Sequence, residues 1–286
     1  MLTKTKPKLI ALDSDGCVYD TMEAKCCLYT VPEVLRHWRL DDVRQEVEAF
    51  YRTYSLTGVT RGANRFLTLH ALFRHLLEAA PPERYGLEHM GLFLQMVERG
   101  EHLSLPAFEQ AYAVTGDMGL KQLIDWAKDV NARVKAGAPD IQTFPLVEES
   151  MKKIKRHANL AVVSTASILT LEREWQNYGF IRYPDAILGH EYGDKWDMIS
   201  RLLAQGFSSD DCLMVGDSFW DYRGSRVCGV RFYPIIAGNE AESWHTLYDT
   251  VLDAFFDNAY SREMEDGYLR RFQSTLGISD EEMLRK

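Results

Sequence analysis

Residues 9–16 read Leu-Ile-Ala-Leu-Asp-Ser-Asp-Gly, a short apolar run that ends in two acidic residues and a glycine. Two further apolar runs end similarly: residues 160–163 precede Ser-Thr-Ala-Ser, and residues 212–215 precede Gly-Asp-Ser. Continuous apolar runs of this length are typical of strands buried on both faces of a parallel sheet. Helical patterns at residues 147–157 and 195–204 lead towards the second and third runs, so the sequence predicts an open α/β sheet. The three polar clusters then lie at the carboxyl ends of the strands, where such sheets bind ligands.

The long segment between the first two predicted strands has a different pattern. It shows little strand signal and carries helical periodicity at residues 43–54, 66–79, 90–98 and 120–134. The prolines at 81 and 82 and the glycine at 100 separate these stretches. The sequence therefore predicts an all-α helix bundle over residues 21–136. The bundle is inserted into a Rossmann-like three-layer α/β/α core with a parallel sheet, made of residues 1–20 and 137–286, whose C-terminal part is helical.

The composition is that of a folded protein with an acidic surface. Of the 286 residues, 46% are hydrophobic, and 42 acidic side chains against 33 basic ones give a net charge of −9. Because non-specific binding to a nucleic-acid backbone needs clustered Lys and Arg, we expect no nucleic-acid partner. An acidic protein still binds a small anionic substrate where a metal ion and a few cations line the site.

The N-terminal residues and the cysteines bear on where the protein works. The apolar stretch at residues 9–12 is too short for a secretory signal or a membrane span, and no later segment is long and uncharged enough to cross a bilayer. The five cysteines have neither a disulfide-framework spacing nor a Cys-x-x-Cys pair, so we expect ordinary thiols. These features predict a cytoplasmic protein that does not bind membranes. The oligomeric state is left open.

Asp13 and Asp15 are the first candidate catalytic residues. Residues two apart on a strand can point to one side, and Gly16 lets the chain turn away after them. Two carboxylates at this spacing can act as nucleophile and as proton carrier. They repel each other unless a cation resolves the conflict, and a hard divalent cation with oxygen ligands does so.

The other two clusters supply further candidates. Asp217 would complete the ligands of the metal, and Asp221 would support it or bind one of its waters. Ser164 offers a hydroxyl group and nearby backbone N–H groups to a phosphoryl oxygen, and Lys195 brings a positive charge to the start of a helix. Taken singly, each of these residues is more often a helix cap or turn residue than a functional one. Their combination in this order is specific.

This ordered set resembles the haloacid dehalogenase-like hydrolase superfamily, in the phosphatase branch with a helical C1-type cap. Residues 12–20, 162–167 and 216–221 are similar to its first, second and fourth motifs, and Lys195 to its third. Ser14 departs from the bulkier apolar residue that is common at its position. The resemblance covers residues 1–20 and about 137–240, and the insertion lies where this superfamily places its cap.

The resemblance implies a mechanism with Mg²⁺ as cofactor. Asp13 would attack phosphorus and form an aspartyl-phosphate, while Asp15 protonates the leaving oxygen and later deprotonates the attacking water. Asp13, Asp15, Asp217 and Asp221 would make the metal site, with Asp15 contributing its backbone carbonyl. The phosphoryl oxygens would be held by Lys195, Ser164 and Thr165.

The resemblance also predicts a phosphomonoesterase that acts on a small phosphorylated metabolite. Because Asp15 is present, the branches that cleave carbon–halogen or carbon–phosphorus bonds are disfavoured. A phosphomutase of the same superfamily is the first alternative, and a catalytically retired binding module is the second. The intact acidic residues and Lys195 argue against the second.

One stretch of the cap, residues 57–65, is a candidate for substrate choice. Its two glycines permit an irregular loop, and Arg61 and Arg65, with Asn64 between them, could grip a second anionic group of the substrate. The alternative is a solvated loop whose arginines pair with local carboxylates. The cap as a whole is expected to exclude water from the reaction.

Overall fold

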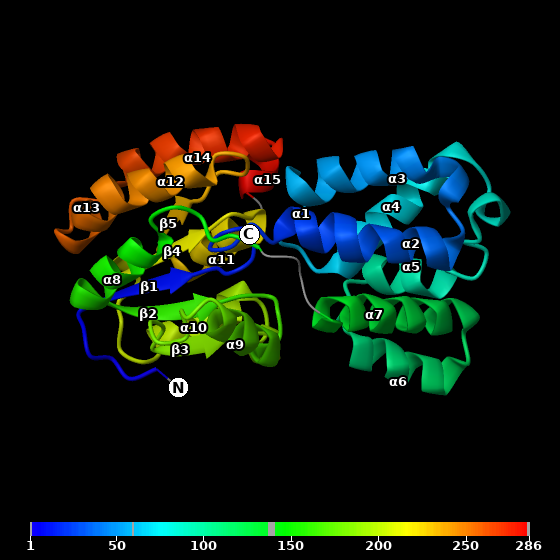
Figure 1. Cartoon of the computed structure of the whole chain (residues 1–286), viewed down its shortest axis with the longest axis horizontal. Coiled ribbons are helices and arrows are strands. Elements are labelled where there is room, and N and C mark those ends of the chain that lie inside the picture. Colours follow the sequence, from blue (N-terminus) through cyan, green and yellow to red (C-terminus); the bar gives the residue numbers. More distant parts are fainter. Residues whose placement is uncertain (1, 59, 137–140, 285–286) are drawn as a thin grey trace. The chain divides into compact units, whose positions relative to one another are not determined.

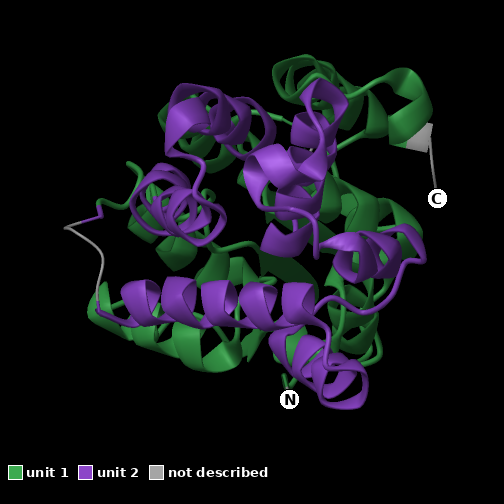
Figure 2. Cartoon of the chain, turned by 90° about the vertical axis from the view of Figure 1, so that its right-hand side faces the viewer, with its two compact units in different colours: residues 1–20, 57–62, 142–286 green, residues 21–56, 63–141 purple. Residues whose placement is uncertain are grey.

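The computed structural model describes residues 2–58, 60–136 and 141–284. The chain divides into two compact units, coloured separately in Figure 2. An α/β unit contains residues 1–20, 57–62 and 142–286, and a helical unit contains residues 21–56 and 63–141.

The α/β unit is built on a parallel sheet whose strands lie in the order β3-β2-β1-β4-β5 (Figure 1). Its strands are β1 (Lys8–Leu12), β2 (Ala158–Val163), β3 (Ala186–Leu188), β4 (Cys212–Gly216) and β5 (Arg231–Pro234). Leu12 lies opposite Val162 of β2 on one side and Val215 of β4 on the other. The chain runs outward from β1 to β3 and then returns to β4. The direction of strand order therefore reverses at β1 and β4, which is where open α/β sheets bind ligands.

Helices cover the sheet, and one face shares a buried apolar cluster with alternate strand residues such as Leu9, Ala11 and Met214. The helices of that cluster are α10 (Lys195–Leu203), α11 (Phe219–Cys228) and α14 (Arg262–Leu276). Two other helices, α8 (Val147–His157) and α9 (Ile168–Asn177), pack on β2 and β3. Because crossovers between parallel strands are right-handed, connections that run in opposite directions place their helices on opposite faces. The outcome is the predicted three-layer arrangement.

The chain after β5 is helical and is anchored on that strand. Its elements are α12 (Glu240–Thr246), a π-helical turn (Leu247–Val251), α13 (Leu252–Phe256), α14 and α15 (Asp280–Leu284). The buried Glu265 carboxylate of α14 accepts the backbone N–H of Phe232 at 3.1 Å and pairs with Arg262 at 2.9 Å. Tyr260 donates its hydroxyl hydrogen to the Phe232 carbonyl. These bonds satisfy the backbone of an edge strand that would otherwise be open.

The described residues of the helical unit form helices and turns around one apolar core. The helices are α1 (Met22–Ala24), α2 (Val31–Trp38), α3 (Arg44–Tyr51), α4 (Arg65–Ala79), α5 (Gly91–Glu98), α6 (Leu105–Thr115) and α7 (Met118–Ala136). Shorter turns cover Lys25–Thr30, Asp41–Val43, Arg52–Leu56 and Pro82–Tyr85. Large side chains such as Trp38, Phe73, Phe93 and Trp126 fill the core. Their burial is the main stabilising term for such a bundle.

The predicted fold class is confirmed, with one difference of assignment. Residues 57–62 were expected in the cap, but their backbone packs with the α/β unit, where the Arg61 side chain also bonds Asp217. The predicted boundary between the cap and the core, between residues 136 and 137, falls next to residues 137–140, which lie outside the described part of the chain. Among the described helices, none combines the length and apolar character that a membrane span requires.

Candidate functional site

The nucleophile candidate Asp13 continues β1 by one residue. Its backbone N–H donates to the Val215 carbonyl at 2.9 Å, so the parallel pairing with β4 extends to this residue. The chain then folds back: Val18 N–H bonds the Ser14 carbonyl at 2.8 Å, and Gly16 adopts a φ of +71°. An L-residue rarely takes such a φ, so glycine is required at this turn. Asp13 is buried and Asp15 is partly exposed.

The acids after β4 belong to the start of α11. Ser218 caps the helix, and the Asp221 carboxylate oxygen Oδ2 accepts from the Ser218 backbone N–H at 3.1 Å and from its hydroxyl at 2.6 Å. A Cβ atom at Gly216 would lie 2.4 Å from the Asp221 carboxyl carbon, so only glycine fits there. Asp217 and Asp221 are fully buried. This capping box fixes the Asp221 side chain, and Asp217 is not part of it.

Lys195 links the two acidic groups. It is the first residue of α10, its side chain is buried, and its Nζ lies 2.8 Å from Asp13 Oδ1 and 2.6 Å from Asp221 Oδ1. The same Nζ donates to the Val163 carbonyl at the end of β2 at 2.8 Å. A cation is unfavourable at a helix N-terminus, but two carboxylates compensate for this here. The structure thus brings together Asp13, Lys195, Asp217 and Asp221 from three separate parts of the sequence.

Arg61 also belongs to this cluster. Its Nε donates to Asp217 Oδ2 at 2.7 Å, and its Nη2 lies 3.4 Å from the Gly16 carbonyl and 3.6 Å from Glu240 Oε1. The next residue, Gly62, has a φ of +67°, and a Cβ there would meet Ser218 at 2.7 Å. The alternative interpretation of the sequence was that Arg61 and Arg65 pair with local carboxylates. The partner found for Arg61 is a site carboxylate 156 residues away.

The acidic residues carry more negative charge than the buried cations balance. In the described part of the chain, the buried cations paired with Asp13, Asp217 and Asp221 are Lys195 and Arg61. Burial, reinforced by Asp221, raises the pKa of Asp13 well above its ordinary value. Burial also raises the pKa of Asp217 to about 6, although Arg61 opposes the shift. Burial alone would lower the pKa of the Lys195 ammonium group, but the negative charges of Asp13 and Asp221 outweigh burial and raise this pKa.

These residues fit a hard divalent cation. One oxygen each of Asp13, Asp217 and Asp221 lies within 4.8 Å of the others. Asp217 Oδ1 is buried and has no hydrogen-bond partner in the described part of the chain. An unpartnered buried carboxylate oxygen is costly unless a cation or a proton compensates it. Carboxylate oxygens are the ligands that Mg²⁺ prefers, so both the donor set and the surplus charge suit this ion.

The predicted phosphate-binding residues follow β2. The Ser164 backbone N–H donates to the Leu188 carbonyl at 3.0 Å, and its hydroxyl accepts from Ala166 N–H at 3.3 Å. Ser164 is buried, whereas Thr165 is exposed. Since β2 is the direct neighbour of β1, Ser164 lies at the same edge of the sheet as Asp13.

The other two cap candidates have partners inside the helical unit. Asn64 caps α4, where its side chain accepts from Phe66 N–H at 3.1 Å and donates to the Leu103 carbonyl at 2.7 Å. The Arg65 guanidinium stacks near the rings of Phe66 and Trp126, and burial lowers its pKa to about 10. Both contacts serve the local fold. A substrate role for Asn64 and Arg65 remains a prediction.

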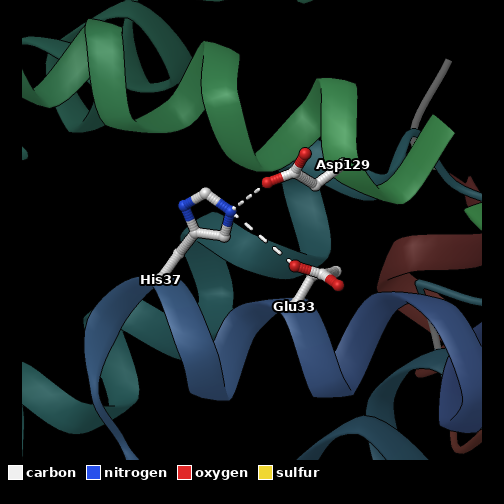
Figure 3. A group of neighbouring side chains, drawn as sticks. All are labelled: Glu33, His37 and Asp129. Carbon is white, nitrogen blue, oxygen red and sulfur yellow. Dashed lines mark hydrogen bonds and ion pairs between the residues drawn. The ribbon is translucent and has the colours of Figure 1, made fainter. Parts of the chain in front are cut away.

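A second group with metal-ligand chemistry lies in the helical unit, where Glu33, His37 and Asp129 meet (Figure 3). His37 Nε2 is 2.9 Å from Asp129 Oδ2 and 3.7 Å from Glu33 Oε2. Glu33 also pairs with Arg36 and Arg133, and Arg36 reaches Asp129 as well. The two arginines neutralise the two carboxylates. This group is therefore an ion-pair network that joins α2 to α7.

The sequence did not reveal several partners of the site. Trp175 and Trp244 donate their indole N–H groups to the turn after Asp13, and Ser218 fixes Asp221. For Ser218 the signal was present, because Ser-x-x-Asp at the start of a helix is a capping-box pattern. For the two tryptophans, no local pattern connects residues 161 and 227 positions apart.

Comparisons with known proteins identify the family to which the chain belongs. Residues 7–229 match the haloacid dehalogenase-like hydrolase family. A solved haloacid dehalogenase-like family hydrolase from Xanthomonas campestris is 11% identical, with 91% of this chain and 98% of that chain covered and a TM-score of 0.50. A HAD-superfamily hydrolase from Geobacter sulfurreducens is 16% identical over 82% and 90% of the two chains, with a TM-score of 0.43. A predicted phosphoglycolate phosphatase from Haemophilus somnus is 14% identical over 79% and 84%, with a TM-score of 0.47. No curated protein matches the sequence significantly.

Proposed function

Because the chain belongs to the haloacid dehalogenase-like hydrolase family, we propose that it is a Mg²⁺-dependent phosphomonoesterase that acts on a small phosphorylated metabolite. One observation carries the proposal. Asp13 is held by Lys195 at the end of β1, and Asp217 at the end of the neighbouring β4 has a buried oxygen without a hydrogen-bond partner in the described chain. A nucleophile, a cation and an open metal ligand at one edge of the sheet are the parts that phosphoryl transfer needs.

The metal would be held by the carboxylates of Asp13 and Asp217 and by the Asp15 backbone carbonyl. Asp221 is the weaker candidate for direct ligation, because Ser218 and Lys195 already engage both of its oxygens. It would instead support the site through Lys195. When bound, Mg²⁺ supplies positive charge that stabilises the negative charge developing on the transferred phosphoryl group.

The chain's own residues divide the remaining work. The Asp13 carboxylate attacks phosphorus and forms an aspartyl-phosphate, while Asp15 donates a proton to the leaving oxygen. Asp15 then accepts a proton from the water that hydrolyses the intermediate and regenerates Asp13. Lys195, Ser164 and Thr165 bind the phosphoryl oxygens and keep the phosphorus in line with the nucleophile.

Arg61 is the candidate for recognition of charge on the substrate. Its guanidinium is buried in the α/β unit and its Nε already bonds Asp217, so it lies at the site itself. A guanidinium has five N–H donors. Those of Arg61 already contact Asp217, the Gly16 carbonyl and Glu240, so a phosphoryl oxygen or a second anionic group would bind by replacing one of these contacts. The free cysteine thiols agree with the cytoplasm as the place of action.

The test is phosphate release from a panel of small phosphate esters, with and without a second anionic group. Each ester is measured with Mg²⁺, with EDTA, and with the Asp13→Asn variant, and Glu33→Gln serves as a control for a buried carboxylate outside the site. We expect Mg²⁺-dependent release that Asp13→Asn abolishes and Glu33→Gln preserves. Release that persists in Asp13→Asn contradicts the covalent mechanism. An isomerised ester, detected by ³¹P NMR in place of free phosphate, shows a phosphomutase.

A further inference from the structure

The turn that carries Asp13 and Asp15 contains an unusual buried hydroxyl group. Ser14 is fully buried between the two acids, and its Oγ accepts the indole N–H of Trp175 at 2.9 Å. Trp175 lies on α9 and is itself fully buried. A bulkier apolar residue at position 14 would leave this indole N–H without the acceptor it uses here.

A second buried indole reaches the other end of the same turn. Trp244 of α12 donates its N–H to the Cys17 carbonyl at 2.8 Å. Two backbone hydrogen bonds close the turn. Val18 N–H bonds the Ser14 carbonyl, and Gly16 N–H bonds the Tyr19 carbonyl at 3.0 Å. Trp244 lies beyond residue 229, where the family match ends. The C-terminal helices thus contribute a contact to the turn that the family match does not include.

Other buried tryptophans show that these bonds do not follow from burial alone. Trp38 and Trp126 are fully buried in the helical unit, and neither indole N–H has a hydrogen-bond partner in the described part of the chain. The indoles of Trp175 and Trp244 instead both end on residues 14–17. A buried donor and acceptor that are paired fix an orientation, because breaking the pair leaves both groups unsatisfied.

We infer that Ser14, Trp175 and Trp244 are positioning residues that hold the turn at residues 14–17 from both ends, and with it Asp13 and Asp15. This inference rests on the proposed function for its effect on catalysis, but the anchoring itself concerns the fold of the turn. Displacing a catalytic group by about 1 Å can cost about 10²-fold in rate. Loss of either indole N–H is therefore expected to lower kcat about 10- to 100-fold, with KM within about threefold.

Trp175→Phe and Trp244→Phe remove the donors and keep an aromatic ring. Trp38→Phe is the matched control, because it alters a buried tryptophan whose indole N–H has no hydrogen-bond partner in the described part of the chain. The first measurement is hydrogen–deuterium exchange of the backbone amides of residues 13–19. We expect faster exchange in both anchor variants and wild-type exchange in Trp38→Phe. Unchanged exchange in the anchor variants overturns the inference, whatever the activity.

The second measurement is a double-mutant cycle on kcat with Ser14→Ala and Trp175→Phe. If one hydrogen bond does the positioning, the double variant loses no more than the larger single loss, within about twofold. Losses that multiply show independent roles and overturn the pairing. Wild-type protein without phosphatase activity, combined with faster exchange in the anchor variants, contradicts the proposed function and supports the anchoring.

Discussion

The two units of the molecule each contain a group of neighbouring carboxylates, and the two groups differ in how their charge is balanced. In the helical unit, Arg36 and Arg133 neutralise Glu33 and Asp129. In the α/β unit, three buried carboxylates share Lys195 and Arg61, and one oxygen of Asp217 lacks a partner in the described chain. A balanced group stabilises the fold that surrounds it. A group with surplus charge costs stability until a cation arrives, and such groups concentrate at functional sites.

The largest expected effect is that of Asp13→Asn. Removing the nucleophile should lower phosphate release at least about 10⁴-fold, since groups that act together in covalent catalysis show losses of this size. The same change should preserve or raise the melting temperature of the metal-free protein, because it removes one of the surplus charges. Steady-state kinetics and thermal unfolding of one preparation check both. A marked drop in the stability of the metal-free protein would show that the site carries no surplus negative charge.

Asp15→Asn should have the next largest effect. Loss of general acid–base help is worth roughly 10²–10⁴ in rate. Asn keeps the size of the side chain, and Mg²⁺ should still raise the melting temperature because the carboxylate of Asp15 is not a proposed ligand. Esters with better leaving groups should lose less activity, since they need less protonation. Equal losses for good and poor leaving groups would contradict the role of Asp15 as the acid.

Stabilisation by Mg²⁺ should depend on pH. Burial holds the pKa of Asp217 at about 6 and raises that of Asp13, so the metal-free folded state binds these protons more tightly than the unfolded chain does. The contribution of Asp217 to metal-free stability is full below about pH 4 and is lost as the pH rises through about 6, and that of Asp13 is likewise lost as the pH rises through its raised pKa.

Mg²⁺ needs the deprotonated carboxylates. Its stabilising effect should therefore be small near pH 5 and full above about pH 7. Thermal unfolding with Mg²⁺ and with EDTA across this range measures the effect, and Glu33→Gln should show the same profile. An effect that is independent of pH would mean that these carboxylates are not the ligands.

Glu33→Gln should have the smallest effect on activity and a measurable one on stability. Glu33 is buried, whereas about half of each arginine side chain is exposed and can be hydrated after the change. We expect a loss of about 1–3 kcal/mol of unfolding free energy and activity within about threefold of wild type. Denaturant unfolding and phosphate release check these two values. If activity falls as far as in Asp15→Asn, the contrast between the two groups fails.

The sequence predicts much of the sheet, and the grouping of polar residues at its edge, because the signals are local. Buried parallel strands leave continuous apolar runs, and the polar residues that follow them must meet at one edge. Three strands and the residues Asp13, Lys195 and Asp217 could therefore be placed before the structure. The strand Ala186–Leu188 was missed because three residues are too few to form a recognisable apolar run, and Arg231–Pro234 was missed because it begins with an arginine and ends with a proline.

The contacts that complete the site could not be predicted in this way. The bond from Arg61 to Asp217 and those from Trp175 and Trp244 to the turn join residues more than 150 positions apart. Such pairs depend on how helices pack, and no repeat or spacing in the sequence encodes them. Ser14 illustrates the same limit, because its departure from an apolar residue is visible in the sequence but its partner is not.

Trapping the covalent intermediate tests the central claim most directly. The protein is mixed with its best ester and Mg²⁺, treated with borohydride, and digested for peptide mass spectrometry. An aspartyl-phosphate is reduced to homoserine, so the account predicts homoserine at position 13, dependent on ester and Mg²⁺ and absent from Asp13→Asn. Turnover of the ester with an unmodified Asp13, or with the label at another carboxylate, would contradict it.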